Sequence, residues 1–469
     1  MSRPSPEIVA IMAALTRHLQ KKTKKINLWS LSQRIENNIG QKVSSHSQLK
    51  KYVRKGKFLL ALCFLLVFNI VEAESSEELV RVNLTNANIN SVFISLQPII
   101  IADKHKTMLS INADSAFQLA FMNHKLYLKI YPVLNQSVEL NAKPQLRLLN
   151  KFKASEDVNF AYNIQAKSLN SKPILKINNK LYADSIELLG SYQPMAKSND
   201  TIALTVINIL ALEDYIKSVV PSEMPSAWPI EALKAQAILA RSYALANLGK
   251  YQKLGFDLKD NIDDQVFSGY IKSSPNVEQA CDLTRGMVLT YNGKIISGFY
   301  HSSAGGSTDL ASNVWHKDIP YLRAVKDFDD SSPYLSWNRK FSVNDLENIL
   351  FGKKSNIINI KLLTLTKNQR VHTLMINTDN NSLLLGGDQL RNMLHLPSTV
   401  FDICYDKDNN LIFNGSGYGH GLGLSQWGAK ALAAKGFTSY DILKYYFSSV
   451  RFHALTMHSP IKLTNEVVF

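Results

Sequence analysis

One carboxylic acid stands out in the sequence because of its setting. Glu223 lies in "VVPSEMPSAW", and its neighbours are almost all apolar: Val219, Val220, Met224, Pro225 and Trp228. Burial among apolar side chains disfavours the charged form of a carboxyl group and raises its pKa. Glu223 is therefore a candidate proton donor at neutral pH. The alternative interpretation is an ordinary charge at the edge of a helix.

A second polar cluster follows in "SGFYHSSAGGSTDLASNVW", where a strand is predicted to end at Tyr300. Its candidate ligand-binding residues are His301, Ser303, Gly305 and Gly306. Hydroxyls and backbone amides in such a turn can hold a polar ligand. The alternatives are a serine-glycine turn without a ligand and a hydrogen-bonded structural histidine.

A glycine-rich segment, "NGSGYGHGLGLSQWGAKALAAKG", contains the last candidates. Its alternating glycines, at 415, 417, 419, 421 and 423, let the backbone approach a ligand or another strand closely. No Gly-Lys-Ser/Thr follows and the dinucleotide fingerprint is absent, so both phosphate-binding interpretations are excluded. His420 in this glycine frame, with Ser425 and Gln426 just after it, suits carbohydrate hydroxyls and amides. Ser425 is expected to cap a helix that ends at Gly436.

Two helices must position Glu223. A β-branched strand near residues 202–210 leads into a helix that begins at Leu212, with Glu213 and Asp214 in its first turn, where the helix dipole favours acids. Pro221 is predicted to end this helix. A second helix is predicted to open near residues 226–229 and to stop at Gly249. Glu223 would then lie between the two helices.

The second helix carries a polar stripe of Glu231, Lys234 and Arg241 and an apolar stripe of Ile230, Leu233, Ala237 and Ala244. The polar stripe is interpreted as a solvated face. Glu231 is explained by the helix dipole alone.

Composition limits the class of protein. With 469 residues, 45% apolar and 19% charged, the chain is globular and long enough for two or three domains. The net charge is +15, but residues 1–57 hold thirteen Lys and Arg against two Glu and so account for +11 of it. Because the basicity belongs mainly to this N-terminal segment, we expect no nucleic-acid partner.

The N-terminal segment predicts export. Basic residues near position 55 precede an apolar run at 58–71 and the small-residue pattern Val71-Glu72-Ala73, which describes a secretory signal cut after Ala73. The run is shorter than a typical spanning helix, and an uncleaved membrane anchor is the alternative. We expect no membrane contact beyond this segment. After cleavage Cys281 and Cys404 remain, either as a disulfide or as two free thiols.

The residue pattern divides the rest of the chain into predicted domains. Residues 74–174 read as short strands joined by turns and predict a β-rich accessory domain without recognisable catalytic residues. The leader is 1–73, the domain with the candidate residues is 175–450, and 451–469 is a C-terminal tail. The expected fold class is α+β.

Four segments in order resemble the sporulation stage II protein D (SpoIID) family, shared with the amidase enhancer LytB. They are "LEDYIKSVVPSEMPSAWPIEALKAQAILARSYAL", "DDQVFSG", "FYHSSAGGSTDLASNVW" and "GYGHGLGLSQWGAKALAAKG". The resemblance implies an exported α+β enzyme that cleaves peptidoglycan glycan strands as a lytic transglycosylase and prefers strands without stem peptides. It needs no cofactor.

The resemblance also assigns residues. The family's essential acid falls on Glu223 and its active-cleft arginine on Arg241. The other substrate-binding positions fall on Gln265, His301, Ser303, Gly305, Gly306, His420, Ser425 and Gln426. Some members carry a zinc site built partly from cysteines, but here Leu258 and Asp264 stand at those positions. Because such sites prefer thiolates, we expect no bound metal.

The number of acids bears on the mechanism. Ordinary glycosidases use two carboxyl groups, whereas a lytic transglycosylase manages with one because the muramyl 6-hydroxyl attacks its own anomeric carbon. Glu223 would act first as acid and then as base. One alternative is a glycan-binding enhancer of a cell-wall amidase. Another is a metal hydrolase using His301, His420 and Asp309, which no metal-binding spacing supports.

Overall fold

We describe a computed structural model of the chain. The described residues are 78–103, 107–134, 137–138, 143–151, 158–166, 174–193, 201–271, 274–456 and 463–467, all within one unit that spans Ser76–Phe469. The predicted export signal lies outside them. None of the helices in these ranges is long and apolar enough to cross a bilayer.

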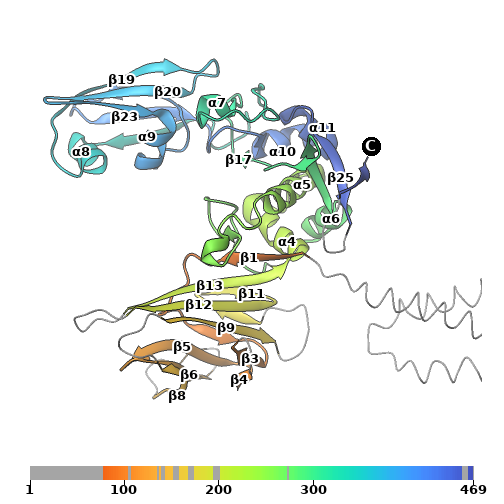
Figure 1. The fold of residues 1–469 in the computed structure, drawn as a ribbon. Coiled ribbons are helices and arrows are strands. Elements are labelled where there is room, and N and C mark those ends of the chain that lie inside the picture. Colours follow the sequence, from red (N-terminus) through yellow and green to blue (C-terminus); the bar gives the residue numbers. More distant parts are fainter. Residues whose placement is uncertain are drawn as a thin grey trace, which may run out of the picture. The chain divides into compact units, whose positions relative to one another are not determined.

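The N-terminal part is made of strands in two sheets (Figure 1). One sheet has the order β14-β1-β13-β12-β9-β3-β4, and the other β11-β10-β2-β5-β6-β7 with β8 paired to β6. The strands are β1 (Leu79–Asn83), β2 (Phe93–Ser95), β3 (Ile99–Ala102), β4 (Thr107–Ile111), β5 (Ser115–Met122), β6 (Lys125–Leu134), β7 (Ser137–Val138), β8 (Gln145–Lys151), β9 (Val158–Ala166), β10 (Leu175–Ile177), β11 (Lys180–Tyr182), β12 (Ser185–Gln193), β13 (Thr201–Ala211) and β14 (Leu258–Lys259).

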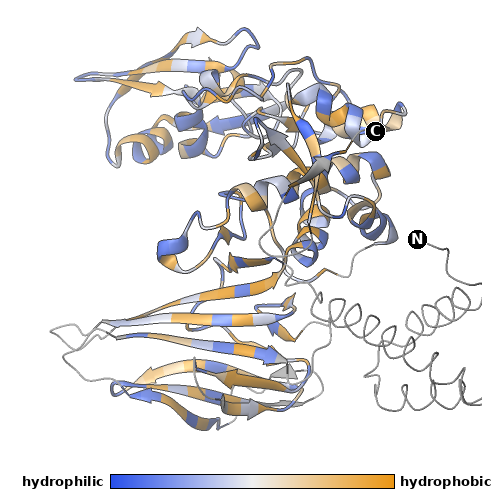
Figure 2. Ribbon diagram, turned by 45° about the vertical axis from the view of Figure 1, so that its right-hand side comes forward, coloured by the Kyte–Doolittle hydropathy of each residue, from blue (hydrophilic) through white to orange (hydrophobic). Residues whose placement is uncertain are grey.

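These strands alternate between apolar and polar residues, as Figure 2 shows. In β1, Val80 and Val82 are fully buried while their neighbours are more exposed. The ring of Phe121 in one sheet contacts Tyr192 in the other, with centroids 5.4 Å apart. The apolar faces of both sheets therefore form one core.

The boundary predicted between residues 174 and 175 falls inside these sheets, because β10–β13 pair with earlier strands. The sheet also extends into the region of the candidate residues. β14 joins β1 in parallel, and the Asp260 N–H donates to the Asn83 carbonyl at 3.1 Å. The strands therefore hold the loop that leads to Gln265.

Helices follow β13 without a break. They pack with a small sheet, β16-β15-β25-β26, and a parallel pair, β17-β24. The elements are α4 (Leu212–Glu223), α5 (Ile230–Ala246), η1 (Gln252–Leu254), α6 (Pro275–Leu283), β15 (Met287–Tyr291), β16 (Lys294–Ile295), β17 (Tyr300–His301), α7 (Ala311–Val314), β24 (Leu424–Ser425), α10 (Gln426–Ala434), α11 (Ser439–Tyr446), β25 (Arg451–Leu455) and β26 (Leu463–Glu466). The mixture of helices and sheets confirms the α+β expectation.

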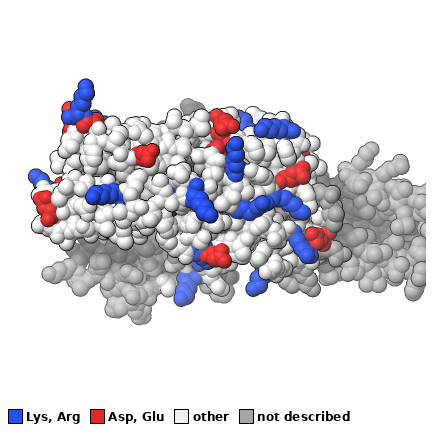
Figure 3. Space-filling view, turned by 90° about the horizontal axis from the view of Figure 1, so that it is seen from above, with Lys and Arg blue, Asp and Glu red and all other residues white. Residues whose placement is uncertain are grey.

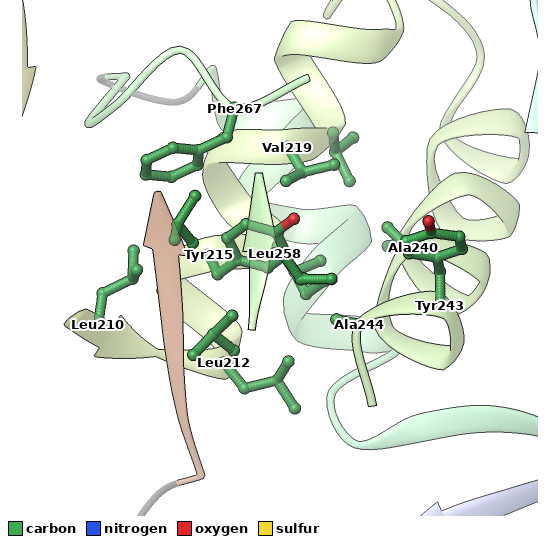
Figure 4. Packing of buried hydrophobic residues seen from close by; sticks show 14 of the residues in the cluster. Leu210, Leu212, Tyr215, Val219, Ala240, Tyr243, Ala244, Leu258 and Phe267 are labelled. Carbon is green, nitrogen blue, oxygen red and sulfur yellow. The ribbon is translucent and has the colours of Figure 1, made fainter. Parts of the chain in front are cut away.

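Helix α5 lies at the centre of this region, in contact with α4, α6, α10 and α11. Figure 4 shows Ala240, Tyr243 and Ala244 of α5 in a cluster with Tyr215 and Val219 of α4. Because neighbours cover α5 on several sides, the prediction of a solvated stripe fails at Arg241, which is fully buried.

One further expectation about an element was wrong. Pro221 does not end α4 but lies in its last turn, and the helix continues to Glu223. A proline there removes only one hydrogen bond, at the end where the helix stops anyway. Within the predicted C-terminal tail, Arg451–Leu455 form β25, which pairs antiparallel with β15 and buries Phe452.

A separate group of elements lies between β17 and β24 in the sequence. It has two three-stranded sheets, β18-β23-β22 and β19-β20-β21, and its own apolar cluster. The elements are β18 (Trp337–Phe341), α8 (Val343–Phe351), β19 (Ile357–Leu365), β20 (Val371–Thr378), β21 (Ser382–Gly386), α9 (Gly387–Leu394), β22 (Val400–Tyr405) and β23 (Leu411–Ser416). We call residues 337–416 the inserted region.

Candidate active site

Glu223 is the last residue of α4 and is half-buried. Its Oε1 accepts a hydrogen bond from the Val266 backbone N–H at 2.7 Å, and its Oε2 lies 3.4 Å from the Nε2 of Gln426. The following residue, Met224, leaves the helix in an extended conformation and is fully buried. Three distant segments thus meet at one carboxyl group.

Tyr300 joins this cluster and was missed by the sequence analysis. Its hydroxyl lies 2.9 Å from Gln265 Oε1 and 3.3 Å from Glu223 Oε1. Gln265 is held in turn by its Nε2, which donates to the Tyr215 hydroxyl at 3.2 Å. The available signal was the position of Tyr300 directly before His301, at the predicted strand end.

The cluster supports both charge states of Glu223. Burial raises the pKa of Glu223 above its ordinary value, while hydrogen bonds from Val266, Gln426 and Tyr300 oppose the rise. The Tyr300 hydroxyl can donate its proton to the Glu223 carboxylate, and when that proton points to Gln265 the hydroxyl oxygen can accept a hydrogen bond from the neutral carboxyl group. A carboxyl group with such an environment can give up a proton and take one back.

Gln426 reaches Glu223 because of local structure at the start of α10. The Ser425 hydroxyl caps this helix, accepting the Gly428 N–H at 3.2 Å, as predicted. β24 pairs in parallel with β17, placing Leu424 beside Tyr300. One strand pair therefore brings both Tyr300 and Gln426 to the acid. Ser425 itself is fully buried and acts as the cap.

The alternating glycines allow this close pairing. Gly423 has φ +69°, and a Cβ there would lie 2.1 Å from the Phe299 carbonyl oxygen. Gly419 has φ +109°, and a Cβ there would lie 2.7 Å from the Cβ of His301. Of the two roles that the sequence left open, the glycine frame serves approach to another strand at these positions.

His301 and His420 lie together beside the cluster, with ring centroids 5.5 Å apart. Nδ1 of His301 donates to the Leu422 carbonyl at 3.0 Å, and Nδ1 of His420 accepts the Leu422 N–H at 3.0 Å. Burial lowers the pKa of His301 to about 3 and holds that of His420 well below its usual value. Both imidazoles are therefore neutral at pH 7.

Residues 200–291, which include Glu223 and Gln265, match the family described as Stage II sporulation protein. Over 259 residues the chain is 32% identical to Stage II sporulation protein D of Bacillus amyloliquefaciens, covering 51% of this chain and 74% of that protein. The chain belongs to the SpoIID family.

Two further relatives are similar. An uncharacterized protein of Brachyspira hyodysenteriae is 36% identical over 274 residues, covering 57% of this chain and 72% of that protein. The amidase enhancer of Bacillus subtilis is 32% identical over 287 residues, covering 50% of this chain and 39% of that protein. Residues 319–423 match a domain of unknown function, DUF8618, that includes the inserted region. These relationships support a role in cell-wall remodelling.

Arg241, which the SpoIID resemblance places in the active cleft, lies elsewhere in this chain. Its guanidinium makes two hydrogen bonds to the Glu213 carboxylate, at 2.7 and 2.8 Å, and a third to the Met287 carbonyl at 3.0 Å. Glu213 and Glu223 are ten residues apart on α4, about 15 Å along the helix axis. Arg241 therefore joins α5 to α4 and is not exposed to bind a glycan.

The SpoIID serine-glycine turn also has an internal partner. The carboxylate of Asp329 accepts hydrogen bonds from the Ser303 hydroxyl and from the N–H groups of Gly305 and Gly306, the last two at 2.8 and 3.2 Å. Asp329 is buried and was missed by the sequence analysis. The amides expected to hold a ligand thus hold a side chain of the protein.

The positions of the zinc-site cysteines in some SpoIID proteins have other roles here. Leu258 is fully buried in β14, and Asp264 binds Lys250 at 2.6 Å and the Tyr243 hydroxyl at 2.9 Å. Within the described ranges no group of three His, Cys, Asp or Glu is placed to hold a metal ion. Cys281, which is buried, and Cys404, which is exposed, are both free thiols.

Proposed function

We propose that this protein is a lytic transglycosylase that cleaves peptidoglycan glycan strands, preferably those without stem peptides. The observation that carries the proposal is the cluster around Glu223. A half-buried carboxyl group with a raised pKa is surrounded by an amide N–H, two glutamines and a tyrosine. Among the described residues, its hydrogen-bond partners include no second carboxyl group.

One carboxyl group suits an intramolecular reaction. Glu223 donates its proton to the glycosidic oxygen as the bond from that oxygen to the anomeric carbon of the muramyl residue breaks. The muramyl 6-hydroxyl then attacks the anomeric carbon and gives its proton to the Glu223 carboxylate. The products are a strand with a free 4-hydroxyl and a 1,6-anhydro-muramyl end, and Glu223 is protonated again. Water takes no part, so a second carboxyl group to activate it is not needed.

The neighbours of Glu223 have separate roles in this scheme. The Val266 N–H and the Gln426 amide stabilise the carboxylate formed after the first proton transfer. Tyr300, fixed by Gln265, keeps the carboxyl group oriented in both charge states. Because these groups are held by β17, α10 and the loop after β14, the acid is positioned before substrate binds. We place this reaction outside the cytoplasmic membrane, since the sequence predicts export.

One relative, the amidase enhancer, favours a second candidate function. A protein that only binds glycan strands and stimulates a cell-wall amidase would need the same surface but no proton donor. Such a protein would release no new strand ends by itself. The amidase is then a partner, and peptidoglycan is the ligand that the two proteins share.

Mass spectrometry of products from purified glycan strands tests these alternatives. The transglycosylase predicts 1,6-anhydro-muramyl ends with the wild-type protein and none with Glu223→Gln. Hydrolysed reducing ends would contradict the proposed mechanism, and binding without any new ends would support the enhancer. Glu231→Gln is a matched control, since Glu231 lies on the next helix and binds Lys234 at 2.8 Å.

A further inference from the structure

One lysine near the candidate site is held by aromatic rings. The Nζ of Lys430, on α10, lies 4.1 Å from the ring centroid of Trp427 and 5.3 Å from that of Trp228. The two indoles contact each other edge to face, with centroids 4.9 Å apart. Trp228 is 8% exposed, while Trp427 and Lys430 are half-buried. The indole faces attract the ammonium group and fix its position.

This ammonium group lacks a carboxylate partner in the part of the chain that the structure describes. Two other half-buried lysines of this region have one: Lys234 binds Glu231 at 2.8 Å, and Lys217 binds Asp282 at 2.8 Å. Glu231 is occupied further, because its second oxygen accepts the Ser439 N–H at 2.7 Å. Lys430 is thus partly removed from water, fixed, and free to bind an anion.

Lys430 also lies close to the acid. Gln426 and Lys430 are four residues apart on α10, so they share one face of the helix with a rise of about 6 Å between them. The Gln426 side chain contacts Glu223 at 3.4 Å. Trp228 closes the turn that follows Glu223, because its backbone N–H donates to the Pro225 carbonyl at 3.0 Å. Helix α10 therefore carries both the residue that contacts the acid and the fixed ammonium group.

The overall distribution of charged side chains on the surface does not by itself explain how an anionic polymer would be selected. On the face of the molecule in Figure 3, Lys and Arg side chains are interspersed with acidic ones. On this face the dispersed pattern gives a polymeric anion no continuous track, so selectivity there has to come from individual fixed groups.

We propose that Lys430 binds the free carboxylate of a muramyl lactyl group on the sugar held next to Glu223. The inference rests on the proposed function, because it needs a muramyl residue at the acid. Muramic acid carries a lactyl ether whose carboxyl group is free in a bare strand and is an amide when a stem peptide is attached. An ammonium group fixed on indole faces pairs with the carboxylate and loses that partner with the amide. Lys430 thereby selects strands from which peptides have been removed.

Binding measurements on the Glu223→Gln background test this without turnover. The probes are a tetrasaccharide of alternating N-acetylglucosamine and N-acetylmuramic acid, the same tetrasaccharide with stem peptides, and chitotetraose, which has no lactyl group. Lys430→Met should weaken binding of the first probe about tenfold and leave chitotetraose unchanged. Lys430→Arg should keep most of the affinity. Raising the salt concentration should narrow the difference between wild type and Lys430→Met.

Lys435→Met, at the C-cap of the same helix, is the matched control. Lys435 is exposed and lies over the Phe328 ring, 4.7 Å from its centroid, so its loss should alter binding of none of the three probes. The inference is overturned if Lys430→Met weakens chitotetraose as much as the muramyl probe, or if neither probe responds. It is also overturned if the peptide-bearing probe shows the larger dependence on Lys430, since the stem-peptide carboxylate would then be the ligand.

Failure of the proposed function would look different. In that case wild-type protein would release no anhydro ends, whereas the binding difference at Lys430 would persist. Circular dichroism of Lys430→Met and Lys430→Arg separates a loss of fold from a loss of contact, and the arginine variant keeps the test decisive where the methionine variant does not fold.

Discussion

The side-chain amide of Gln426 lies 3.4 Å from the carboxylate of Glu223, although 203 residues separate them in the chain. Gln426 is the first residue of α10 and Glu223 the last of α4. Both helix ends are therefore needed to form the site. The fixed position of each follows from a cap at Ser425 and from burial of Met224.

Tyr300→Phe should change the pH dependence of strand cleavage. The Tyr300 hydroxyl lowers the pKa of Glu223 by its hydrogen bond, so removal of the hydroxyl raises that pKa further. Cleavage needs the protonated acid and falls as pH rises through its pKa. The basic limb of the kcat/KM profile should therefore move to higher pH, with a lower maximum. Tyr334→Phe, which removes the hydroxyl of a ring that packs tilted against Tyr418 outside the cluster, should leave the profile in place.

Arg241→Met should destabilise the protein. It leaves the Glu213 carboxylate buried without its partner, which typically costs about 3–5 kcal/mol in the free energy of unfolding. The double variant Glu213→Leu/Arg241→Met should recover part of that loss, because no charge remains buried. Urea unfolding measures both. A stable Arg241→Met protein with weakened glycan binding would instead support the active-cleft role.

Gly423→Ala should be more harmful than Gly436→Ala. Both glycines have positive φ, +69° and +88°, and so both substitutions carry a backbone penalty of about 1 kcal/mol. Only at Gly423 would the added Cβ lie 2.1 Å from the Phe299 carbonyl oxygen; at Gly436 nothing lies within 4 Å. Gly423→Ala should separate β17 from β24 and lower both the melting temperature and activity. Equal effects of the two changes would contradict this packing.

His301 should make the protein sensitive to acid. Its pKa is lowered to about 3 in the folded state from an ordinary value of 6.5, so the unfolded chain binds the proton more readily. The contribution of neutral His301 to the free energy of unfolding is then complete above about pH 6.5 and is lost as pH falls toward 3. His301→Gln should lower stability at pH 7 but flatten the fall in melting temperature between pH 7 and pH 5. His316→Gln, at an exposed position, should retain the wild-type slope.

Several local features of this protein could be predicted from its sequence, because they depend on residues that are close together in the chain. The strand before α4, the Ser425 cap and the glycine stops at Gly249 and Gly436 follow from propensities that act over a few residues. Glu223 was identified because its apolar neighbours are adjacent in sequence. The motif order was sufficient to indicate the family.

Only the tertiary structure decided what each polar side chain binds. In the sequence Arg241 has the spacing of a residue on a solvated helix face, but in the fold it binds Glu213 of α4. The amides of Gly305 and Gly306 have the pattern of a ligand site, but in the fold they donate to Asp329. Tyr300 becomes part of the site through the pairing of β17 with β24, across more than a hundred residues. Such contacts depend on how distant elements pack, and neither propensity nor spacing encodes packing between segments that far apart in the chain.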